Sequence, residues 1–378
     1  MSLAELGDEQ REIRDLARRF AEQEVAPHAA AWDREHRFPR EVLTALGELG
    51  LMGVCVPEAH GGAGADDRSS CRGLEELSRA DAGLGVTVAV HLGAGTLPIL
   101  RFGSREQVER LVPALAQGHE LAAFALTESG AGSDAAAIRA QADEDGRITG
   151  TKQWITNGSY AHVFIVFARD GAAGGRPSAF LVRRGAPGLR ATREEAKLGL
   201  NSSSTADLAF DATPGERLAE PGAGLRVALS TLDGGRIGIA AQAVGIAQAA
   251  LDLAAAYARE RSAFGRPLAA FGAIQQKLAD MQTEIEAARA LTWRAARLKD
   301  AGRPHTVEGA QAKLFASRVA RQWTGEAIQV LGGYGYTKEF PAERYYRDAK
   351  VTEIYEGTSE IQRLVIARAL LGEAARDG

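Results

Sequence analysis

A single carboxylate near the end of the chain is the best candidate for acid–base chemistry. Glu356 is followed at once by Gly357, and a predicted helix starts directly after them. Ser359 and Gln362 have the three-residue spacing of a capping box, and apolar residues follow. Glu356 should therefore lie in the loop before this helix, where a carboxylate can act as a base on a bound substrate. Most acidic side chains are solvated surface charges, so this interpretation needs support from other segments.

A glycine-rich segment, TESGAGSD at 127–134, follows a predicted strand over 121–126. Its glycines let backbone N–H groups approach a ligand, and the hydroxyls of Thr127 and Ser133 add donors, which suits phosphate oxygens or a ring carbonyl. The segment is neither a P-loop nor a dinucleotide fingerprint, because no Gly-Lys-Ser/Thr follows and the third glycine is absent. A plain glycine turn between two strands is the alternative interpretation.

The segment KQWITNG at 152–158 alternates like a strand that ends in a hairpin-type turn. Trp154 has a ring that could stack near a planar cofactor, and Thr156 has a hydroxyl that could hydrogen-bond to it. The alternative for Trp154 is an aromatic side chain of the core.

Two glycine-containing segments are predicted at the ends of one long helix. Residues 233–236, with sequence DGGR, should open it, and their glycines keep the entrance free for a ligand or for close backbone packing. Arg261 should end it, in the segment RSAFG, where its fork could bind a pyrophosphate. An exposed cation at a helix end is the alternative.

A further glycine cluster closes a later helix, in the segment QVLGGYGY at 329–336. Helix capping explains Gly332 but not its neighbours, which indicates a close contact with something else. Residues 344–348, RYYRD, fit an ion-pair network as well as a site. The seven histidines show no metal-ligand spacing, so no metal site is predicted.

Length and composition set the broad class. The 378 residues predict two or three domains, and the net charge of −4 provides no basic field for nucleic acid or anionic membranes. Cys55 and Cys71 form no paired motif, so a reducing cytoplasm is expected. The start of the chain fits neither a signal nor a transit peptide, and no apolar segment is expected to reach the roughly 20 residues that span a bilayer.

The hydrophobic pattern divides the chain into three parts. Residues 1–120 have helical spacing, residues 121–224 have short apolar runs separated by turn signals, and residues 225–378 return to long helices. Strands are expected over 121–126, 147–156, 163–167, 179–182 and 207–210. In the last part, Ile274, Leu278, Met281, Ile285 and Ala288 form a near-heptad stripe, which predicts core packing or a contact with another subunit.

Taken together, these segments resemble the acyl-CoA dehydrogenases over nearly the whole chain and in the same order. The motifs are TESGAGSD, KQWITNG, RSAFG and QVLGGYGY, together with LDGGRIG at 232–238 and, above all, EIYEGTSEIQR at 353–363. The likeness is greatest to the short-chain, butyryl-type members. It implies an α+β multidomain fold: an N-terminal all-α domain, a middle β-barrel or sandwich domain and a C-terminal four-helix bundle.

The resemblance also implies a cofactor, FAD, and a reaction. Glu356 would abstract the α-proton of a short-chain acyl-CoA, flavin N5 would accept the β-hydride, and an electron-transferring flavoprotein would receive the electrons. A desolvated pocket should raise the pKa of Glu356. A homotetramer is implied, with Arg261 and residues 329–333 reaching FAD from a neighbouring subunit.

The residues implied for each role form two sets. Contacts to FAD are implied for Phe124, Leu126, Thr127, Gly132, Ser133, Trp154, Ile155, Thr156, Arg261, Phe264, Gln329, Leu331, Gly332, Gly333, Thr358 and Glu360. Contacts to acyl-CoA are implied for Ser133, Asp233, Arg236 and Gly357.

Three positions bear on these expectations. Some relatives carry the base where this chain has Gly235, so Glu356 has no competitor. Gly272 replaces a glutamine expected to contact FAD across the subunit interface, and Asn201 stands where relatives often have arginine near CoA. Alternative functions are a dehydrogenase of branched-chain or carrier-protein-bound acyl thioesters, and a silent acyl-CoA-binding scaffold.

Overall fold

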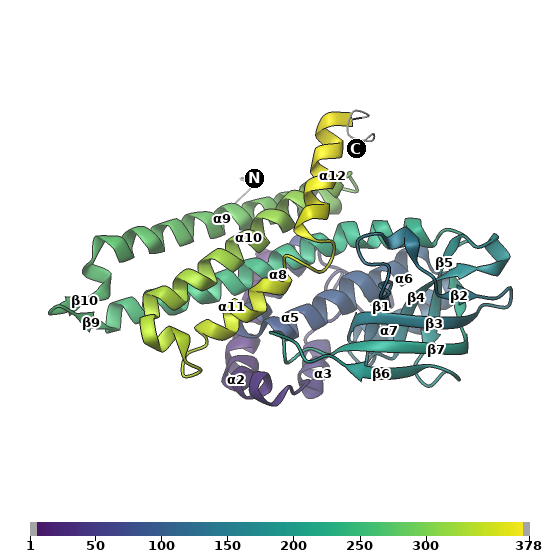
Figure 1. The fold of residues 1–378 in the computed structure, drawn as a ribbon, viewed down its shortest axis with the longest axis horizontal. Coiled ribbons are helices and arrows are strands. Elements are labelled where there is room, and N and C mark those ends of the chain that lie inside the picture. Colours follow the sequence, from purple (N-terminus) through teal and green to yellow (C-terminus); the bar gives the residue numbers. More distant parts are fainter. Residues whose placement is uncertain (1–5, 373–378) are drawn as a thin grey trace.

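The computed structural model describes residues 6–372. Residues 1–5 of the first predicted part and residues 373–378 of the last predicted part lie outside the described residues. The first part is helical, as predicted, and its helices pack on one side of the long C-terminal helices (Figure 1). Its helices are α1 (Asp8–Phe20), α2 (Ala26–Glu35), α3 (Arg40–Glu48), α4 (Asp67–Ala80), α5 (Ala82–Ala89), α6 (Leu97–Phe102) and α7 (Arg105–Ala116).

The middle part is a sheet with the strand order β6-β7-β3-β2-β4-β5-β8, and β1 pairs with β4 in parallel. Its strands are β1 (Ala122–Ala125), β2 (Gln141–Ala142), β3 (Arg147–Thr156), β4 (Val163–Asp170), β5 (Pro177–Arg183), β6 (Arg190–Glu194), β7 (Thr205–Pro214) and β8 (Glu216–Leu218). The five expected strands are confirmed. The sequence missed β2, β6 and β8, because β2 and β8 are very short and β6 is exposed along its whole length.

The prediction of a hairpin-type turn after Thr156 is wrong. β3 and β4 follow each other in the chain, but β2 lies between them in the sheet. Asn157 adopts a left-handed φ of 66°, and its buried side chain donates hydrogen bonds to the carbonyls of Thr87 and Ala122. The turn therefore ties the sheet to the N-terminal helices instead of closing a hairpin.

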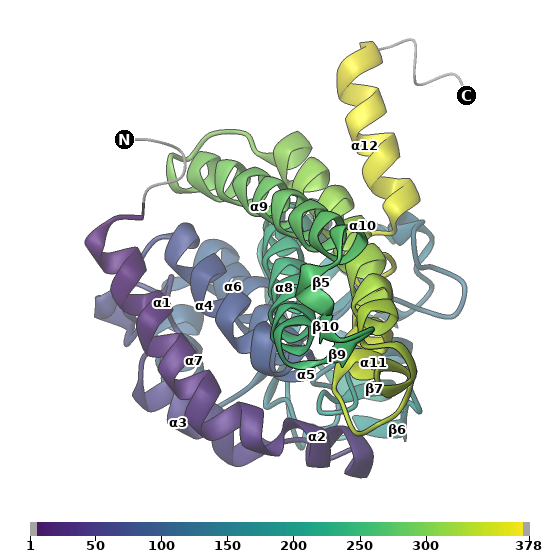
Figure 2. The ribbon, with the colours of Figure 1, turned by 90° about the vertical axis from the view of Figure 1, so that its left-hand side faces the viewer.

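The C-terminal part is built on three long helices, α8 (Gly224–Glu260), α9 (Gly272–Asp300) and α10 (Thr306–Leu331), followed by α11 (Ala342–Val351) and α12 (Ser359–Leu371). A two-stranded sheet of β9 (Ser262–Ala263) and β10 (Arg266–Pro267) lies between α8 and α9. The stripe on α9 packs in the core as predicted. Figure 2 shows α12 projecting away from the other helices.

The prediction that residues 233–236 open a helix is wrong. They lie inside α8, which starts at Gly224. The glycines misled the interpretation because glycine is a common boundary residue, whereas tertiary packing overrides its low helix propensity here.

The expectation about long apolar segments is also wrong. The stretches Ala82–Phe102 and Gly224–Glu260 are long and apolar enough to cross a membrane, but 78% of each apolar window is buried inside the protein. Glycine and threonine interrupt the apolar runs without ending these helices, so the sequence understated their length. Such burial is typical of core helices.

Residues 344–348 form an ion-pair network that joins α11 to the N-terminal part. Arg347 pairs with Asp33 of α2 at 2.6 Å and with Glu343 of its own helix at 2.6 Å. Asn201 donates to the same Asp33 carboxylate at 2.9 Å. The Asn201 side chain thus helps to connect the three parts of the chain.

Candidate active site

Glu356 lies in the loop between α11 and α12, as predicted. Its φ of 52° and the φ of 84° at Gly357 place two consecutive residues in the left-handed region, which is unusual for a glutamate. Gln362 donates from its side chain to the carbonyls of Glu356, at 3.2 Å, and Gly357, at 2.8 Å. The strained loop is therefore held by specific contacts, as is common at functional sites.

The predicted capping box at the start of α12 is wrong by one residue. Thr358 is the N-cap, and its side-chain oxygen accepts from the backbone N–H of Ile361. Ser359 is the first residue of the helix. Both residue types are good N-caps, so the sequence could not choose between them, and Gln362 holds the loop instead of completing a box.

The carboxylate of Glu356 is desolvated and incompletely paired. Its Oε2 atom is buried and has no hydrogen-bond partner within residues 6–372. Burial raises the pKa of Glu356 to about 7, against the opposing positive charges of Arg236 and Lys313. The predicted rise is confirmed, and it gives the carboxylate a pKa suited to a general base near neutral pH.

Gly235 makes room for this carboxylate. A Cβ atom at Gly235 would lie 2.8 Å from Oε2 and 3.1 Å from Oε1 of Glu356. Any side chain at this position of α8 would displace the carboxylate. The sequence identified Gly235 only as a position that lacks an alternative base. The structure shows that a glycine is also needed there to leave space for the Glu356 carboxylate.

The predicted substrate residues on α8 interact with each other. Arg236 is buried and pairs through Nη1 with Asp233 at 2.8 Å, and Asp233 also accepts from Thr306 at 2.7 Å. The Nε of Arg236 is buried without a partner among the described residues. Ser133 is exposed on the loop after β1.

A small cavity of about 30 Å³ borders Gly235. It lies between α8, the α4 and α5 region and the end of α9, and most of its lining is apolar or glycine. Cys71 and the Asp67–Lys299 ion pair, 2.6 Å between charged atoms, also line it. The space has room for roughly one small group.

The loop at 127–134 is held in place through Glu128 and has open space at its glycines. The Glu128 carboxylate accepts from the backbone N–H groups of Arg139 and Ala140 and pairs with Lys152 at 2.7 Å. At Gly130 and Gly132 a Cβ would meet nothing within 4 Å. A rigid base with open glycines fits the predicted ligand loop better than a plain turn.

Trp154 is not a core aromatic. Its side chain is 57% exposed, and its φ of 61° is strained for a bulky residue. The side chains of Leu126 and Ile155 are buried, and Phe124 packs on Phe167 at 4.8 Å between ring centroids. Any cofactor contact of Leu126 or Ile155 would therefore use the backbone.

The residues implied to reach FAD from a neighbouring subunit gather at the end of the bundle away from the sheet, where β9 and β10 lie (Figure 1). Arg261 is exposed and lies 5.9 Å from the ring centroid of Tyr334, and Phe264 is 95% exposed. Within one chain, this group does not join the Glu356 loop.

The glycines of that group differ in their surroundings. Gly332 caps α10 with a φ of 62°, as predicted, and side chains at Gly332 and Gly333 would meet nothing within 4 Å. The close contact is at Gly335, whose Cβ would lie 2.5 Å from the Ile328 carbonyl. Gln329 is exposed and Leu331 is buried. Gly272 begins α9 with open space around it.

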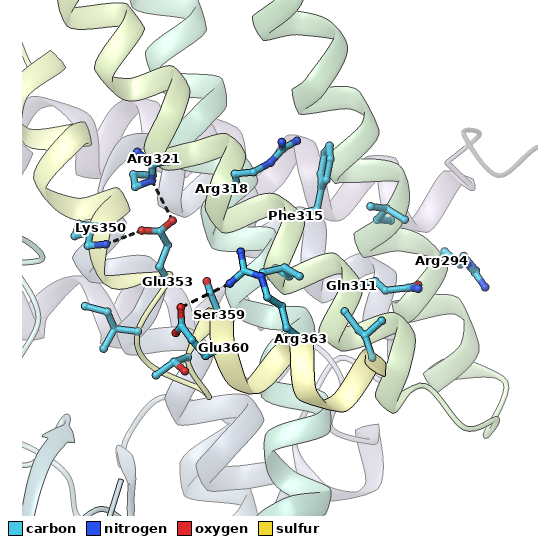
Figure 3. A pocket seen from close by; sticks show the side chains of 15 residues that line it. Arg294, Gln311, Phe315, Arg318, Arg321, Lys350, Glu353, Ser359, Glu360 and Arg363 are labelled. Carbon is cyan, nitrogen blue, oxygen red and sulfur yellow. Dashed lines mark hydrogen bonds and ion pairs between the residues drawn. The ribbon is translucent and has the colours of Figure 1, made fainter. Parts of the chain in front are cut away.

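A larger groove is lined by residues that come shortly before and after Glu356 in the chain (Figure 3). It has a volume of about 800 Å³ and lies between α9, α10, α12 and the loop before α12. Thr358 and Glu360, both implied to contact FAD, line it together with basic side chains such as Arg321 and Arg363.

Sequence reasoning missed the lysine beneath the loop. Lys313 of α10 is fully buried and donates from Nζ to the carbonyl of Gly357 at 2.7 Å. It also missed the roles of Glu128, Lys152 and Gln362. The first two stood inside recognised motifs, whereas a single lysine in a long helix carries no signal of its own.

Comparisons with known proteins agree with this architecture. Family models match the N-terminal domain of acyl-CoA dehydrogenases at residues 7–119, the middle domain at 123–213 and the C-terminal domain at 222–371. The chain is a member of the acyl-CoA dehydrogenase family, and it is an oxidoreductase.

Individual relatives are similar over nearly their whole lengths. The mitochondrial short-chain specific acyl-CoA dehydrogenase of Bos taurus is 51% identical, with 97% of this chain and 91% of that protein covered. The butyryl-CoA dehydrogenase structure from Megasphaera elsdenii is 42% identical, with a TM-score of 0.94 and coverage of 97% and 99%. A chain in a structure described as the electron transferring flavoprotein of Acidaminococcus fermentans is 43% identical, with a TM-score of 0.96 and coverage of 98% and 100%.

Proposed function

We propose that this protein catalyses the FAD-dependent α,β-dehydrogenation of short-chain acyl-CoA thioesters to trans-2-enoyl-CoA, with Glu356 as the base. The observation that carries the proposal is the buried carboxylate of Glu356, which has an unpartnered Oε2 and a pKa near 7. A structural carboxylate at such a depth is normally fully hydrogen-bonded. One that is left unpaired is available to a substrate.

The surrounding residues fit a flavin. The open glycines at 130 and 132 leave backbone groups accessible, and Trp154 presents an exposed ring from a residue with a left-handed φ. Thr127, Ser133 and Thr156 would add hydroxyl donors. When bound, the flavin supplies the acceptor for the two electrons that leave the substrate. The other residues that the family resemblance implied to contact FAD belong to the same proposal.

The protein contributes proton abstraction and alignment. The thioester α-proton is weakly acidic, so its removal requires a carboxylate within hydrogen-bond reach. Glu356 in its ionised form accepts this proton, and burial removes its Oε2 atom from water. The left-handed loop fixes the direction of approach, since Gln362 and Lys313 donate hydrogen bonds to its backbone carbonyls. Asp233 and Arg236 would contact the acyl-CoA from α8.

A short acyl chain is supported by the small cavity beside Gly235. Its volume of about 30 Å³ and its closure by the Asp67–Lys299 pair leave little space for carbons beyond the reacting ones. The names of the mitochondrial and Megasphaera relatives reported above specify short-chain substrates. Branched-chain and carrier-protein-bound thioesters are the alternatives.

We extend the proposal to partners and location. An electron-transferring flavoprotein is the proposed acceptor, and the Acidaminococcus structure supports it. Exposed Leu364, Leu370 and Leu371 on the projecting α12 support a homotetramer, as does the separation along the bundle between the β9–β10 end and the start of α12 (Figure 1). The free cysteines fit a reducing cytoplasm. The proposed domains remain residues 1–120, 121–224 and 225–378.

The test is anaerobic titration of the purified holoenzyme with acyl-CoAs of increasing length, followed by the flavin spectrum. We expect the flavin to bleach fully with butyryl-CoA and progressively more slowly with hexanoyl- and octanoyl-CoA. Bleaching only with branched or long acyl-CoA would move the assignment to the alternative substrates. A protein that cannot be reconstituted with FAD would leave only the silent scaffold.

A further inference from the structure

Lys313 lies directly beneath the Glu356 loop and is fully buried in α10. A buried ammonium normally pairs with a carboxylate, since an uncompensated charge is costly. Here its Nζ donates instead to the backbone carbonyl of Gly357, at 2.7 Å. The lysine therefore forms its hydrogen bond with the backbone of Gly357, the residue that follows the proposed base.

The charges around this lysine come from three elements. Glu356 lies on the loop, with Glu353 before it and Glu360 at the start of α12, and Arg236 faces the site from α8. Burial lowers the pKa of Lys313 to about 8, and the nearby glutamates oppose that shift. At neutral pH the side chain is still mainly a cation.

We propose that Lys313 is a positioning residue that holds the Gly357 carbonyl and, through its positive charge, increases the ionised fraction of Glu356 at neutral pH. The inference rests on the proposed role of Glu356 as the base. Burial alone favours the protonated carboxyl, and the Lys313 and Arg236 cations counteract it. Without one cation, less of the enzyme would have a base able to accept a proton.

Gln362 provides a matched comparison. It is also fully buried and donates to the same Gly357 carbonyl, at 2.8 Å, but it is neutral. Replacing Gln362 removes its two loop contacts, to the carbonyls of Glu356 and Gly357, and leaves the charges around Glu356 unchanged. Replacing Lys313 removes both a contact and a charge. The two substitutions thus separate loop support from electrostatic tuning.

The experiment compares Lys313→Met and Gln362→Met holoenzymes by the pH dependence of kcat/KM for butyryl-CoA, with FAD content read from the visible spectrum. A base must be ionised, so activity rises as pH rises through the pKa of Glu356. We expect Lys313→Met to move this acid limb upward by about one pH unit, which is roughly a tenfold loss below it. Gln362→Met should lower activity at every pH without moving the limb.

A second measurement covers the case in which Lys313→Met does not fold. In the wild-type protein and in Lys313→Arg, the infrared band of the protonated Glu356 carboxyl, identified by its loss in Glu356→Gln, is titrated against pH. Retention of the cation predicts nearly equal midpoints. An unshifted limb in folded Lys313→Met, or a shifted midpoint in Lys313→Arg, would overturn the proposal. An unreactive wild-type flavin would instead contradict the proposed function.

Discussion

Two regions of the molecule combine a glutamate with a fully buried lysine, but the lysine has a different role in each region. In the middle part, Lys152 pairs with Glu128 at 2.7 Å and also donates to the Leu126 carbonyl. In the C-terminal part, Lys313 donates to the Gly357 carbonyl and leaves the adjacent Glu356 carboxylate without this contact. The same two residue types thus form a fixed support in one region and a reactive group in the other.

The pKa values of the two glutamates show the consequence. Burial acts to raise the pKa of Glu128, but the bonds from Lys152 and from two backbone N–H groups outweigh it and hold that pKa below its usual value. Burial raises the pKa of Glu356 to about 7, because the two nearby cations only partly oppose it. Glu356 is suited to act as a base because burial raises its pKa and its buried Oε2 accepts no hydrogen bond from the described residues that would offset this rise.

Lys152→Met should remove the ion pair with Glu128 in the middle part and cause the largest decrease in the free energy of unfolding. It leaves Glu128 buried without its cation, which costs about 3–5 kcal/mol in the free energy of unfolding. Chemical denaturation of the FAD-free protein measures this loss. Lys277→Met is the control, since its pair with Glu326 is much more exposed and should contribute less than about 1 kcal/mol. Equal losses for the two variants would remove the distinction.

Gly235→Ala should disturb the catalytic region without a comparable loss of stability. The new Cβ would lie within 3.1 Å of the Glu356 carboxylate, which is the mobile end of a side chain and can move aside. A displacement of about 1 Å at a reacting group can reduce the rate about 100-fold. Steady-state kcat with butyryl-CoA and the thermal midpoint measure the two effects.

Gly325→Ala is the matched control for that substitution. Gly325 also lies inside a long helix, α10, and its Cβ would come no nearer than 3.5 Å to Tyr346, which is an ordinary contact. We expect the activity of Gly325→Ala with butyryl-CoA to fall by less than about threefold, because the substitution involves none of the mechanisms that make single changes costly. If both alanines reduced kcat equally, the steric relation between Gly235 and Glu356 would carry no catalytic weight.

Much of this comparison could be predicted from the sequence, and its limits have physical causes. The alternation of residues 147–156 predicted β3 with its observed bounds, and the segment around Glu356 predicted a loop before a helix. Trp154 was open to misassignment because an aromatic residue type does not reveal a left-handed φ or an exposed ring. Lys313 gave no signal, since its partner is a backbone carbonyl 44 residues away.

The central claim is that the Glu356 carboxylate removes the substrate proton, and anaerobic single-turnover reduction of Glu356→Gln holoenzyme by butyryl-CoA tests it most directly. Glutamine keeps the size of the side chain, so FAD should bind with an unchanged spectrum. The account predicts that the flavin-bleaching rate falls about 10⁴-fold at pH 8, the upper range for loss of a general base. Bleaching at the wild-type rate would contradict it.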